Sequence, residues 1–218
     1  MTAQAAGKSK CAQQALEEAI LVADRYDLNE ELIHTYLAYG HAFRNSGQLD
    51  RAGDIYARAI DYCAKTKYQD TEVHMHLQAA LGGLLCTKER YAEARVALEK
   101  AVELRVALHL PPDQPTLEAY TLLARCYGML EDWENADVFA RQAYDMSKDL
   151  FGASNANTLW TLSLWAMAAM GLGNWQRANT LLSRLRTALN KKKQHGYFQG
   201  LETLDQMVLY LETGMGHR

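Results

Sequence analysis

The chain has 218 residues, of which 49% are hydrophobic and 22% charged, with a formal net charge of −3 at pH 7. This composition suits a folded domain with its own core, and the weak negative charge argues against a general nucleic-acid binder, because phosphate binding needs a concentrated basic surface. The longest apolar run, residues 159–172, is interrupted by polar residues. It falls short of the roughly 20 residues that span a membrane, so no membrane insertion is expected.

The N-terminus and the cysteines indicate where the protein works. Residues 1–10 contain two lysines but are not followed by the apolar core of a signal peptide, which predicts a cytoplasmic protein. The four cysteines stand singly within helical patterns, at positions Cys11, Cys63, Cys86 and Cys126. Such an arrangement is typical of reduced thiols in a core rather than of a disulfide framework.

The first predicted element is a helix over residues 10–28. Ala12, Leu16 and Ala19 recur there at helical spacing. Because the same pattern returns later as the second half of each repeat, the chain is predicted to open with half a repeat.

Four helical hairpins follow, predicted at residues 29–68, 71–110, 113–152 and 155–194. The turn inside each hairpin has a similar sequence, at Gly47–Ala52, Glu89–Ala94, Glu131–Ala136 and Gly173–Ala178. Their final alanines, at positions 52, 94, 136 and 178, keep a constant step of 42 residues. A fixed period of this length indicates a stack of repeated structural units.

Apolar residues on both sides of each turn recur at three- and four-residue spacing, which predicts two helices per repeat. In the first hairpin they are Tyr36, Tyr39, Gly40 and Phe43 before the turn, and Ala52, Tyr56 and Ala59 after it. We expect the small residues to let the two helices approach closely, with Gly40 or Ala124 of the first helix against Ala52 or Ala136 of the second.

A last predicted helix covers residues 197–213, where Leu201, Leu204, Val208 and Leu211 keep helical register. It is expected to cap the final hairpin, since terminal elements of repeat proteins differ from the internal ones. The sequence therefore predicts an all-α solenoid forming a single domain over residues 1–218. It would contain about ten helices: a half repeat, four hairpins and a C-terminal capping helix.

The repeats resemble the tetratricopeptide repeat, over roughly residues 10–213. The shared pattern is a large apolar residue, Leu, Gly or Ala and Tyr in the first helix, then Ala, an aromatic residue and Ala in the second. The 42-residue step and the segments Thr116–Ala124 and Thr158–Ala166 are similar to the long repeats of kinesin light chains. The resemblance implies a right-handed α-α superhelix that binds a protein or peptide partner on its concave surface.

The same resemblance implies which residues face the partner, because the first helices line the concave surface in that family. Taking Gly40, Gly82, Ala124 and Ala166 as equivalent positions, the expected peptide-binding residues are His34, Leu37, His41, Arg44, Asn45, His76, Thr121, Arg125, Met129, Trp160, Ser163, Met167 and Met170. Ala79, Gly83, Thr87 and Glu118 occupy further inward positions.

These residues predict a groove that runs from basic and polar to apolar. Arg44 and Arg125 are suited to carboxylates, and Trp160 with the methionines is suited to a bulky apolar anchor. Two alternatives stay open: the arginines are solvated without a ligand, or Trp160 and the methionines pack against the capping helix. The Lys and Asn that clamp a chaperone's terminal carboxylate in related proteins are replaced by Leu37 and His41, so no chaperone adaptor is predicted.

No catalytic or cofactor motif is present in the sequence. It lacks Gly-x-Ser-x-Gly, Cys-x-x-Cys, a phosphate loop and His-Glu-x-x-His. His74 and His76 are two residues apart, so on a helix they point roughly 200° away from each other and do not share a metal. We therefore predict a non-enzymatic protein without cofactor or metal.

Two other functions stay open. In the first, the chain is a self-assembling scaffold whose exposed apolar residues, among them Tyr197, Phe198 and Tyr210, mediate homo-oligomerisation. In the second, it is a regulatory or sensor module that changes its superhelical pitch when a ligand binds.

Overall fold

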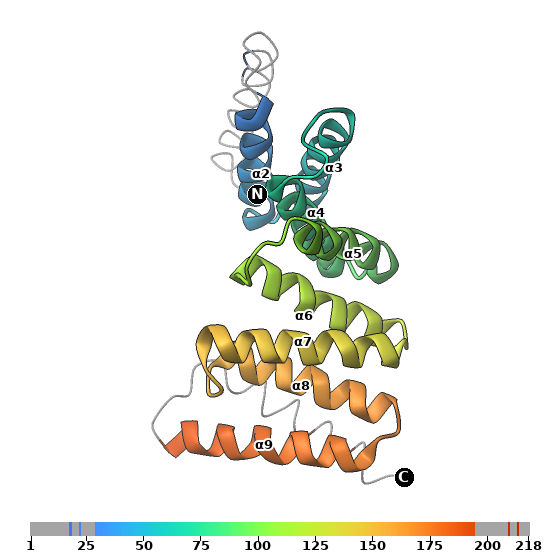
Figure 1. Ribbon diagram of the computed structural model, residues 1–218, viewed down its shortest axis with the longest axis vertical. Helices are drawn as coiled ribbons and strands as arrows, with labels where there is room; N and C mark the ends of the chain where they lie inside the picture. The colour runs from blue at the N-terminus through green and yellow to red at the C-terminus, as the bar shows by residue number, and fades with distance from the viewer. Residues whose placement is uncertain (1–17, 19–21, 23–28, 195–208, 210–212, 214–218) are drawn as a thin grey trace. The chain divides into compact units, whose positions relative to one another are not determined.

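The computed structural model describes residues 29–194 and the single residues 18, 22, 209 and 213 (Figure 1). The described elements are eight α-helices, α2 (Asn29–Asn45), α3 (Leu49–Lys65), α4 (Glu72–Thr87), α5 (Tyr91–Ala107), α6 (Gln114–Met129), α7 (Trp133–Phe151), α8 (Ala156–Gly171) and α9 (Trp175–Gln194). The described residues include no strand, so the expected all-α class is confirmed. The half repeat and the capping helix predicted at residues 10–28 and 197–213 lie outside the described residues, apart from the single positions.

The helices fall into two compact units, divided between Leu110 and Pro111. Unit 1 holds the hairpins α2–α3 and α4–α5, and unit 2 holds α6–α7 and α8–α9. Within each unit the helices pack in chain order, and the two first helices also lie side by side, α2 with α4 and α6 with α8. Each unit therefore presents a face made of two first helices.

The turn inside each hairpin has the same backbone geometry in all four repeats. One residue adopts a positive φ, at Gly47 (77°), Glu89 (58°), Glu131 (61°) and Gly173 (70°). The next residue donates its backbone N–H to a carbonyl five residues earlier, as from Gln48 to Phe43 at 2.9 Å and from Arg90 to Leu85 at 3.0 Å. These hydrogen bonds form a Schellman motif, which ends the first helix. The backbone conformation of the turn thus repeats every 42 residues, as the sequence does.

Short polar side chains begin several of the helices. Thr71, Asp113 and Asn155 accept hydrogen bonds from backbone N–H groups in the first turns of α4, α6 and α8. Asp132 caps α7 by accepting from the N–H of Asn135 at 3.2 Å. Such caps satisfy N–H groups that have no partner inside the helix, so the polar linkers fix where each helix starts.

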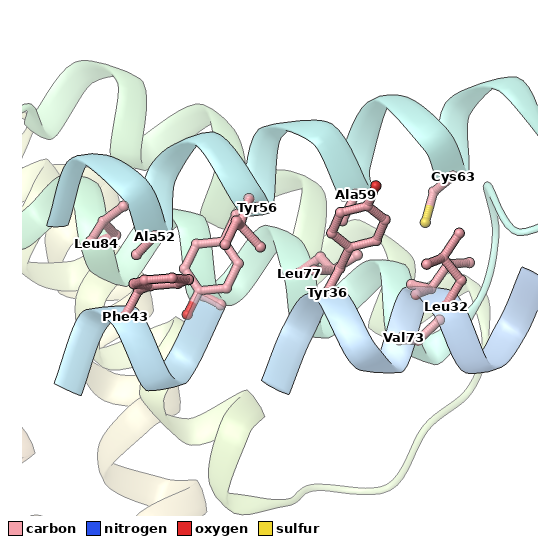
Figure 2. Close-up of a cluster of buried hydrophobic side chains, with 13 residues drawn as sticks. Leu32, Tyr36, Phe43, Ala52, Tyr56, Ala59, Cys63, Val73, Leu77 and Leu84 are labelled. Atoms are coloured by element: carbon pink, nitrogen blue, oxygen red, sulfur yellow. The ribbon is translucent and has the colours of Figure 1, made fainter. Parts of the chain in front are cut away.

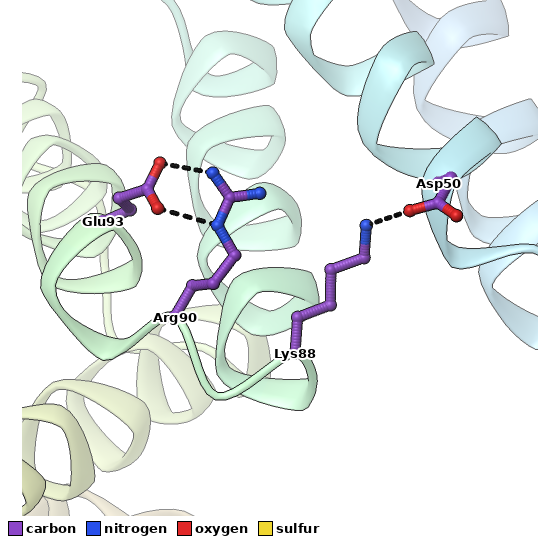
Figure 3. A network of polar contacts seen from close by, with 4 residues as sticks. All are labelled: Asp50, Lys88, Arg90 and Glu93. Carbon is purple, nitrogen blue, oxygen red and sulfur yellow. Dashed lines mark hydrogen bonds and ion pairs between the residues drawn. The ribbon is translucent and has the colours of Figure 1, made fainter.

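Two charged pairs surround the turn between α4 and α5 (Figure 3). Arg90 donates two hydrogen bonds to Glu93, at 2.7 and 2.6 Å, and Lys88 Nζ donates to Asp50 Oδ1 of α3 at 2.5 Å. The hydrogen bond from Arg90 lowers the pKa of the Glu93 carboxyl, and that from Lys88 lowers the pKa of the Asp50 carboxyl. The Asp50 side chain is 96% exposed, so solvent screens its pair strongly.

The core of unit 1 lies between its helices and is built from alternating small and large side chains (Figure 2). Ala52 and Ala59 are fully buried on α3, on either side of Tyr56. Tyr56 packs between the two helices close to Phe43 of α2, and burial raises its pKa to about 12. The repeated alanines of the other turns, Ala94, Ala136 and Ala178, are buried in the same way.

The residue opposite Gly40 is Tyr56 rather than the expected Ala52. A Cβ added to Gly40 would lie 2.6 Å from Cδ1 and 2.7 Å from Cζ of the Tyr56 ring. At the equivalent place in α4, a Cβ added to Gly82 would lie 2.7 Å from Cδ2 of Leu98. Each glycine therefore leaves room for a large side chain of the second helix.

A polar network joins the helices of unit 2. Trp165 Nε1 of α8 donates to Asp137 Oδ1 of α7 at 3.0 Å, and Arg177 of α9 donates to the same oxygen. Only 17% of the Asp137 side chain is exposed. One carboxylate thus links three consecutive helices.

None of the described cysteines forms a disulfide, as the sequence predicts. Cys63, Cys86 and Cys126 are all buried, and burial raises the pKa of Cys63 to about 11. Because the thiolate is the reactive form, Cys63 is inert at neutral pH. Among the described helices, none combines the length and apolar character required to cross a membrane.

Candidate functional site

The residues predicted to bind a partner all lie on the first helices of the hairpins. His34, Leu37, His41, Arg44 and Asn45 belong to α2, His76 to α4, Thr121, Arg125 and Met129 to α6, and Trp160, Ser163, Met167 and Met170 to α8. Because α2 neighbours α4 and α6 neighbours α8, the structure brings them together in two groups, one in each unit.

In the unit 1 group, His41 is held by the second helix of its own hairpin. Its Nδ1 lies 3.1 Å from Oη of Tyr56, and the two rings meet edge to face with centroids 5.8 Å apart. His34 and Asn45 are exposed, and Arg44 is half-buried. Leu37 packs against the core of unit 1, so the accessible part of this group is polar.

His76 of α4 adds one polar atom that the fold leaves unsatisfied. Its side chain is half-buried, and its Nε2 is buried without a hydrogen-bond partner within the described residues. A buried nitrogen of this kind is costly unless it is satisfied.

In unit 2 a pocket of about 230 Å³ opens between α6 and α8. Its lining residues are Gln114, Leu117, Glu118, Thr121 and Leu122 of α6 and Asn157, Trp160 and Thr161 of α8. The half-buried Trp160 and Leu122 provide apolar surface, and the exposed Gln114, Glu118 and Asn157 provide a polar rim. This combination suits an apolar side chain carried on a polar chain.

The remaining residues of this group lie further along the two helices. Arg125 and Met129 of α6 are exposed, Met129 by 53%. Met167 and Met170 of α8 are half-buried against the core of unit 2, and Met167 Cε would be 3.5 Å from a Cβ added to Gly128. The α8 methionines therefore also help to pack their helix.

Ser163 is the one predicted residue of unit 2 that is fully buried. Its hydroxyl donates to the backbone carbonyl of Trp160 at 2.7 Å. It lies inside the fold, and we leave it out of the binding face that we propose below.

The structure adds pocket residues that the sequence did not single out: Gln114, Leu117, Leu122, Asn157 and Thr161. Gln114 directly follows the capping residue Asp113, and Asn157 lies two residues after the capping residue Asn155. A polar residue in the first turn of each helix was the available signal, and it does not distinguish a pocket from an ordinary helix start. Leu117 and Thr161 are buried and read as ordinary core residues.

Charge changes sign along α6. Glu118 lies at the pocket, and Arg125 follows seven residues later, which places it about 10 Å further along the helix at 1.5 Å per residue. The described part of the chain has no cluster of three or more His, Cys, Asp or Glu residues that could hold a metal ion. The chemistry offered here is that of binding: an apolar contact flanked by a negative and a positive side chain.

Comparison with known proteins supports the repeat architecture described above. Sequence models of the tetratricopeptide repeat match residues 33–66 and 74–149, whereas comparison with curated protein sequences gives no match. The structure is similar to BtubC from P. vanneervenii, with a TM-score of 0.67, 17% identity, and coverage of 100% of this chain and 94% of that chain.

Two further solved structures have the same fold. A Podosopora anserina protein of kinesin light chain type, with nearly identical TPR-like repeats, gives a TM-score of 0.60 at 18% identity over 87% of this chain and 96% of that chain. YrrB, a TPR protein, gives a TM-score of 0.59 at 14% identity over 91% of this chain and 93% of that chain. The repeat step, the hairpin geometry and these matches agree, and the chain belongs to the tetratricopeptide-repeat family.

Proposed function

We propose that the chain is a non-enzymatic adaptor that holds a peptide segment of a partner protein on the face of its first helices. The observation that carries the proposal is the α6–α8 pocket, in which Trp160 forms an apolar wall beside a polar rim. Tetratricopeptide repeats are protein-interaction modules, and the similar protein YrrB has an unusual peptide-binding site.

The charges along α6 give the peptide a direction. An apolar side chain occupies the Trp160 pocket, and an acidic residue of the peptide lies toward Arg125, where a guanidinium can form two parallel hydrogen bonds with a carboxylate. Glu118 would repel an acid placed at the pocket itself. In unit 1, Arg44 and the exposed His34 and Asn45 provide an equivalent polar face.

A pull-down from the source lysate tests this proposal. Wild-type protein is compared with the double variant Arg44→Glu/Arg125→Glu on the first helices, and captured proteins are identified by mass spectrometry. The matched control is Arg58→Glu/Arg141→Glu, which makes the same charge change at exposed residues of the second helices α3 and α7. Partners that bind wild type and control but not the first-helix variant support the proposal. Equal capture by all three proteins contradicts it.

The self-assembling scaffold and the ligand-responsive module make different predictions for the same protein. A scaffold shows a molar mass that rises with concentration in light scattering. A sensor shows a ligand-dependent change in radius of gyration. An adaptor of the proposed kind keeps a constant mass, and its dimensions change little when the peptide binds.

A further inference from the structure

Unit 2 has a second pocket, of about 630 Å³, that the proposed function does not use. It is lined by residues of α7, α8 and α9, and none of its described lining residues also lines the α6–α8 pocket. On α8 the first pocket takes Trp160, whereas the second takes Leu159 and Leu162. Residues one or two apart on a helix point in different directions, so one helix serves two separate sites.

The second pocket combines an apolar part with an exposed arginine that contacts a tyrosine. Leu159, Leu162 and Tyr144 are buried, and Ala188 is half-buried. Arg184 of α9 donates a hydrogen bond to Tyr144 Oη at 2.8 Å, and its Cζ lies 5.5 Å from the centroid of the Tyr144 ring. A guanidinium carries five N–H donors in one plane, and this hydrogen bond uses one of them, so the contact with Tyr144 leaves the other donors for a ligand.

The charge of the pocket is positive. Arg184 and Lys191 line it, and none of its described lining residues is an aspartate or glutamate. An arginine suits a carboxylate because it forms two parallel hydrogen bonds with it. The ligand is therefore expected to be acidic, with an apolar group for the alanines of the lining, Ala153 and Ala188.

The threonines of α9 can accept hydrogen bonds from a ligand. Thr180 and Thr187 donate their hydroxyl protons to the carbonyls of Gln176 and Ser183, at 2.9 and 2.8 Å, so both hydroxyl oxygens remain as acceptors. A peptide backbone supplies N–H groups to such acceptors, whereas a fatty acid has none. Thr180 and Lys191, both lining residues, are about 16 Å apart along α9, which matches roughly five residues of extended chain.

We propose that this pocket is a second peptide site, which binds a short, extended, acidic segment of a partner protein. An apolar side chain of the segment contacts Ala153 and Ala188, the accessible apolar residues of the lining. A neighbouring carboxylate binds Arg184, and backbone N–H groups donate to the threonine hydroxyls. The site is independent of the first-helix face, so the two sites can hold different segments.

A random peptide library displayed on phage, selected against the full chain, provides the probes. Recovered peptides are synthesised with a fluorescein label, and their dissociation constants are measured by fluorescence polarisation. Binding is compared for wild type, Arg125→Glu, Arg184→Glu, Arg184→Lys and Arg186→Glu. The last variant is the matched control, because Arg186 is exposed on the same helix and does not line the pocket. Circular dichroism verifies that each variant is folded.

The expected result is a class of peptides in which Asp or Glu stands next to a large apolar residue. Their dissociation constants rise about tenfold or more with Arg184→Glu, less with Arg184→Lys, and within about twofold with Arg186→Glu or Arg125→Glu. The proposal is overturned if no recovered peptide responds to Arg184→Glu, or if those that respond are not acidic. Arg184-dependent binding of dodecanoate without any such peptide also overturns it. Peptides that respond to Arg125→Glu alone support the first-helix face and leave the second site without support.

Discussion

The two units differ where the first helix of each hairpin crosses the second. In unit 1 the first helices carry glycine at the crossing and the second helices carry a large residue, whereas in unit 2 the first helices carry alanine. The four pairs at equivalent positions are Gly40 with Tyr56, Gly82 with Leu98, Ala124 with Ala140 and Ala166 with Leu182. In unit 1 a single added methyl group would overlap the opposite side chain, while unit 2 already accommodates that methyl group. The same helical hairpin can thus form with glycine or with alanine at the crossing position of its first helix.

Spectroscopy can follow the units separately. All four tryptophans of the chain, at positions 133, 160, 165 and 175, belong to unit 2. Tryptophan fluorescence therefore follows the unfolding of unit 2, and far-UV circular dichroism follows both units. A stability effect can be assigned to one unit by comparing the two signals.

The largest effect is expected from Gly40→Ala. The new Cβ would lie 2.6 Å from Cδ1 of Tyr56, and overpacking of a tight core typically costs about 1–3 kcal/mol. The gain in helix propensity, about 1 kcal/mol, offsets only part of a clash this severe, so we expect a net loss of about 2 kcal/mol in the unfolding free energy of unit 1. Urea unfolding followed by circular dichroism measures it.

Gly128→Ala in unit 2 is the matched control. A Cβ there would meet Met167 and Trp133 at 3.5 Å, which is an ordinary contact, so this variant should be at least as stable as wild type. If Gly40→Ala proved as stable as Gly128→Ala, the claim that Tyr56 leaves no room for a Cβ at position 40 would be contradicted.

The next largest effect is expected from Asp137→Ala in unit 2. The substitution leaves the indole N–H of Trp165 and the guanidinium of Arg177 without their shared acceptor. Loss of hydrogen bonds to a partly buried charge costs about 2 kcal/mol, and urea unfolding followed by tryptophan fluorescence measures it. Asp145→Ala, on an exposed part of the same helix, should have little effect. Equal losses for the two variants would contradict the role of the network.

A smaller, stabilising effect is expected from Glu89→Gly in unit 1 and Glu131→Gly in unit 2. Both glutamates have positive φ at the turn position that is glycine in the other two repeats. Relief of this backbone strain is partly offset by the greater chain entropy of glycine in the unfolded state, which leaves a gain of about 0.5–1 kcal/mol. Thermal unfolding measures it. Gly47→Ala should show the reverse, and a loss of stability in either glycine variant would refute the argument.

The smallest effect is expected from Asp50→Asn. Lys88 lowers the pKa of Asp50 below its usual 3.8 in the folded state. The ion pair therefore stabilises the protein above the unfolded-state pKa, and this contribution is lost as the pH falls through the lower folded-state pKa. Because Asp50 is exposed, wild type and variant should differ by a small, salt-sensitive shift in Tm at pH 7 and by none at pH 2. A difference that persisted at pH 2 would point to another cause.

The fold was accessible from the sequence because its periodic signals are local. Ala52, Ala94, Ala136 and Ala178 are buried, as their constant step predicts, and the turns before them share one backbone geometry. The residue of α3 that lies opposite Gly40 could not be predicted in the same way. Both Ala52 and Tyr56 lie on the correct face of α3, and only the relative positions of the two helices along their axes select Tyr56.

The candidate site could be predicted only partly from the sequence. The period identifies which helices line the face, and Thr121 and Trp160 do line a pocket. Position alone does not predict depth, since Ser163 follows Trp160 by three residues and is nevertheless fully buried. The second pocket, lined by α7, α8 and α9, could not be predicted from any sequence pattern. Tyr144 and Arg184 are forty residues apart, and neither belongs to a motif.

Because all four turns share one backbone geometry, the first part of one turn can be joined to the second part of another without changing the turn. Deleting residues 90–131 removes one period of 42 and joins Glu89, which has positive φ, to Asp132, which follows such a residue in its own turn. The junction would keep its turn, but Gly82 would then face Ala140 in place of Leu98, leaving a cavity where a leucine had been. Removal of this repeat would therefore be limited by the side chains at the helix crossing rather than by the backbone of the turn.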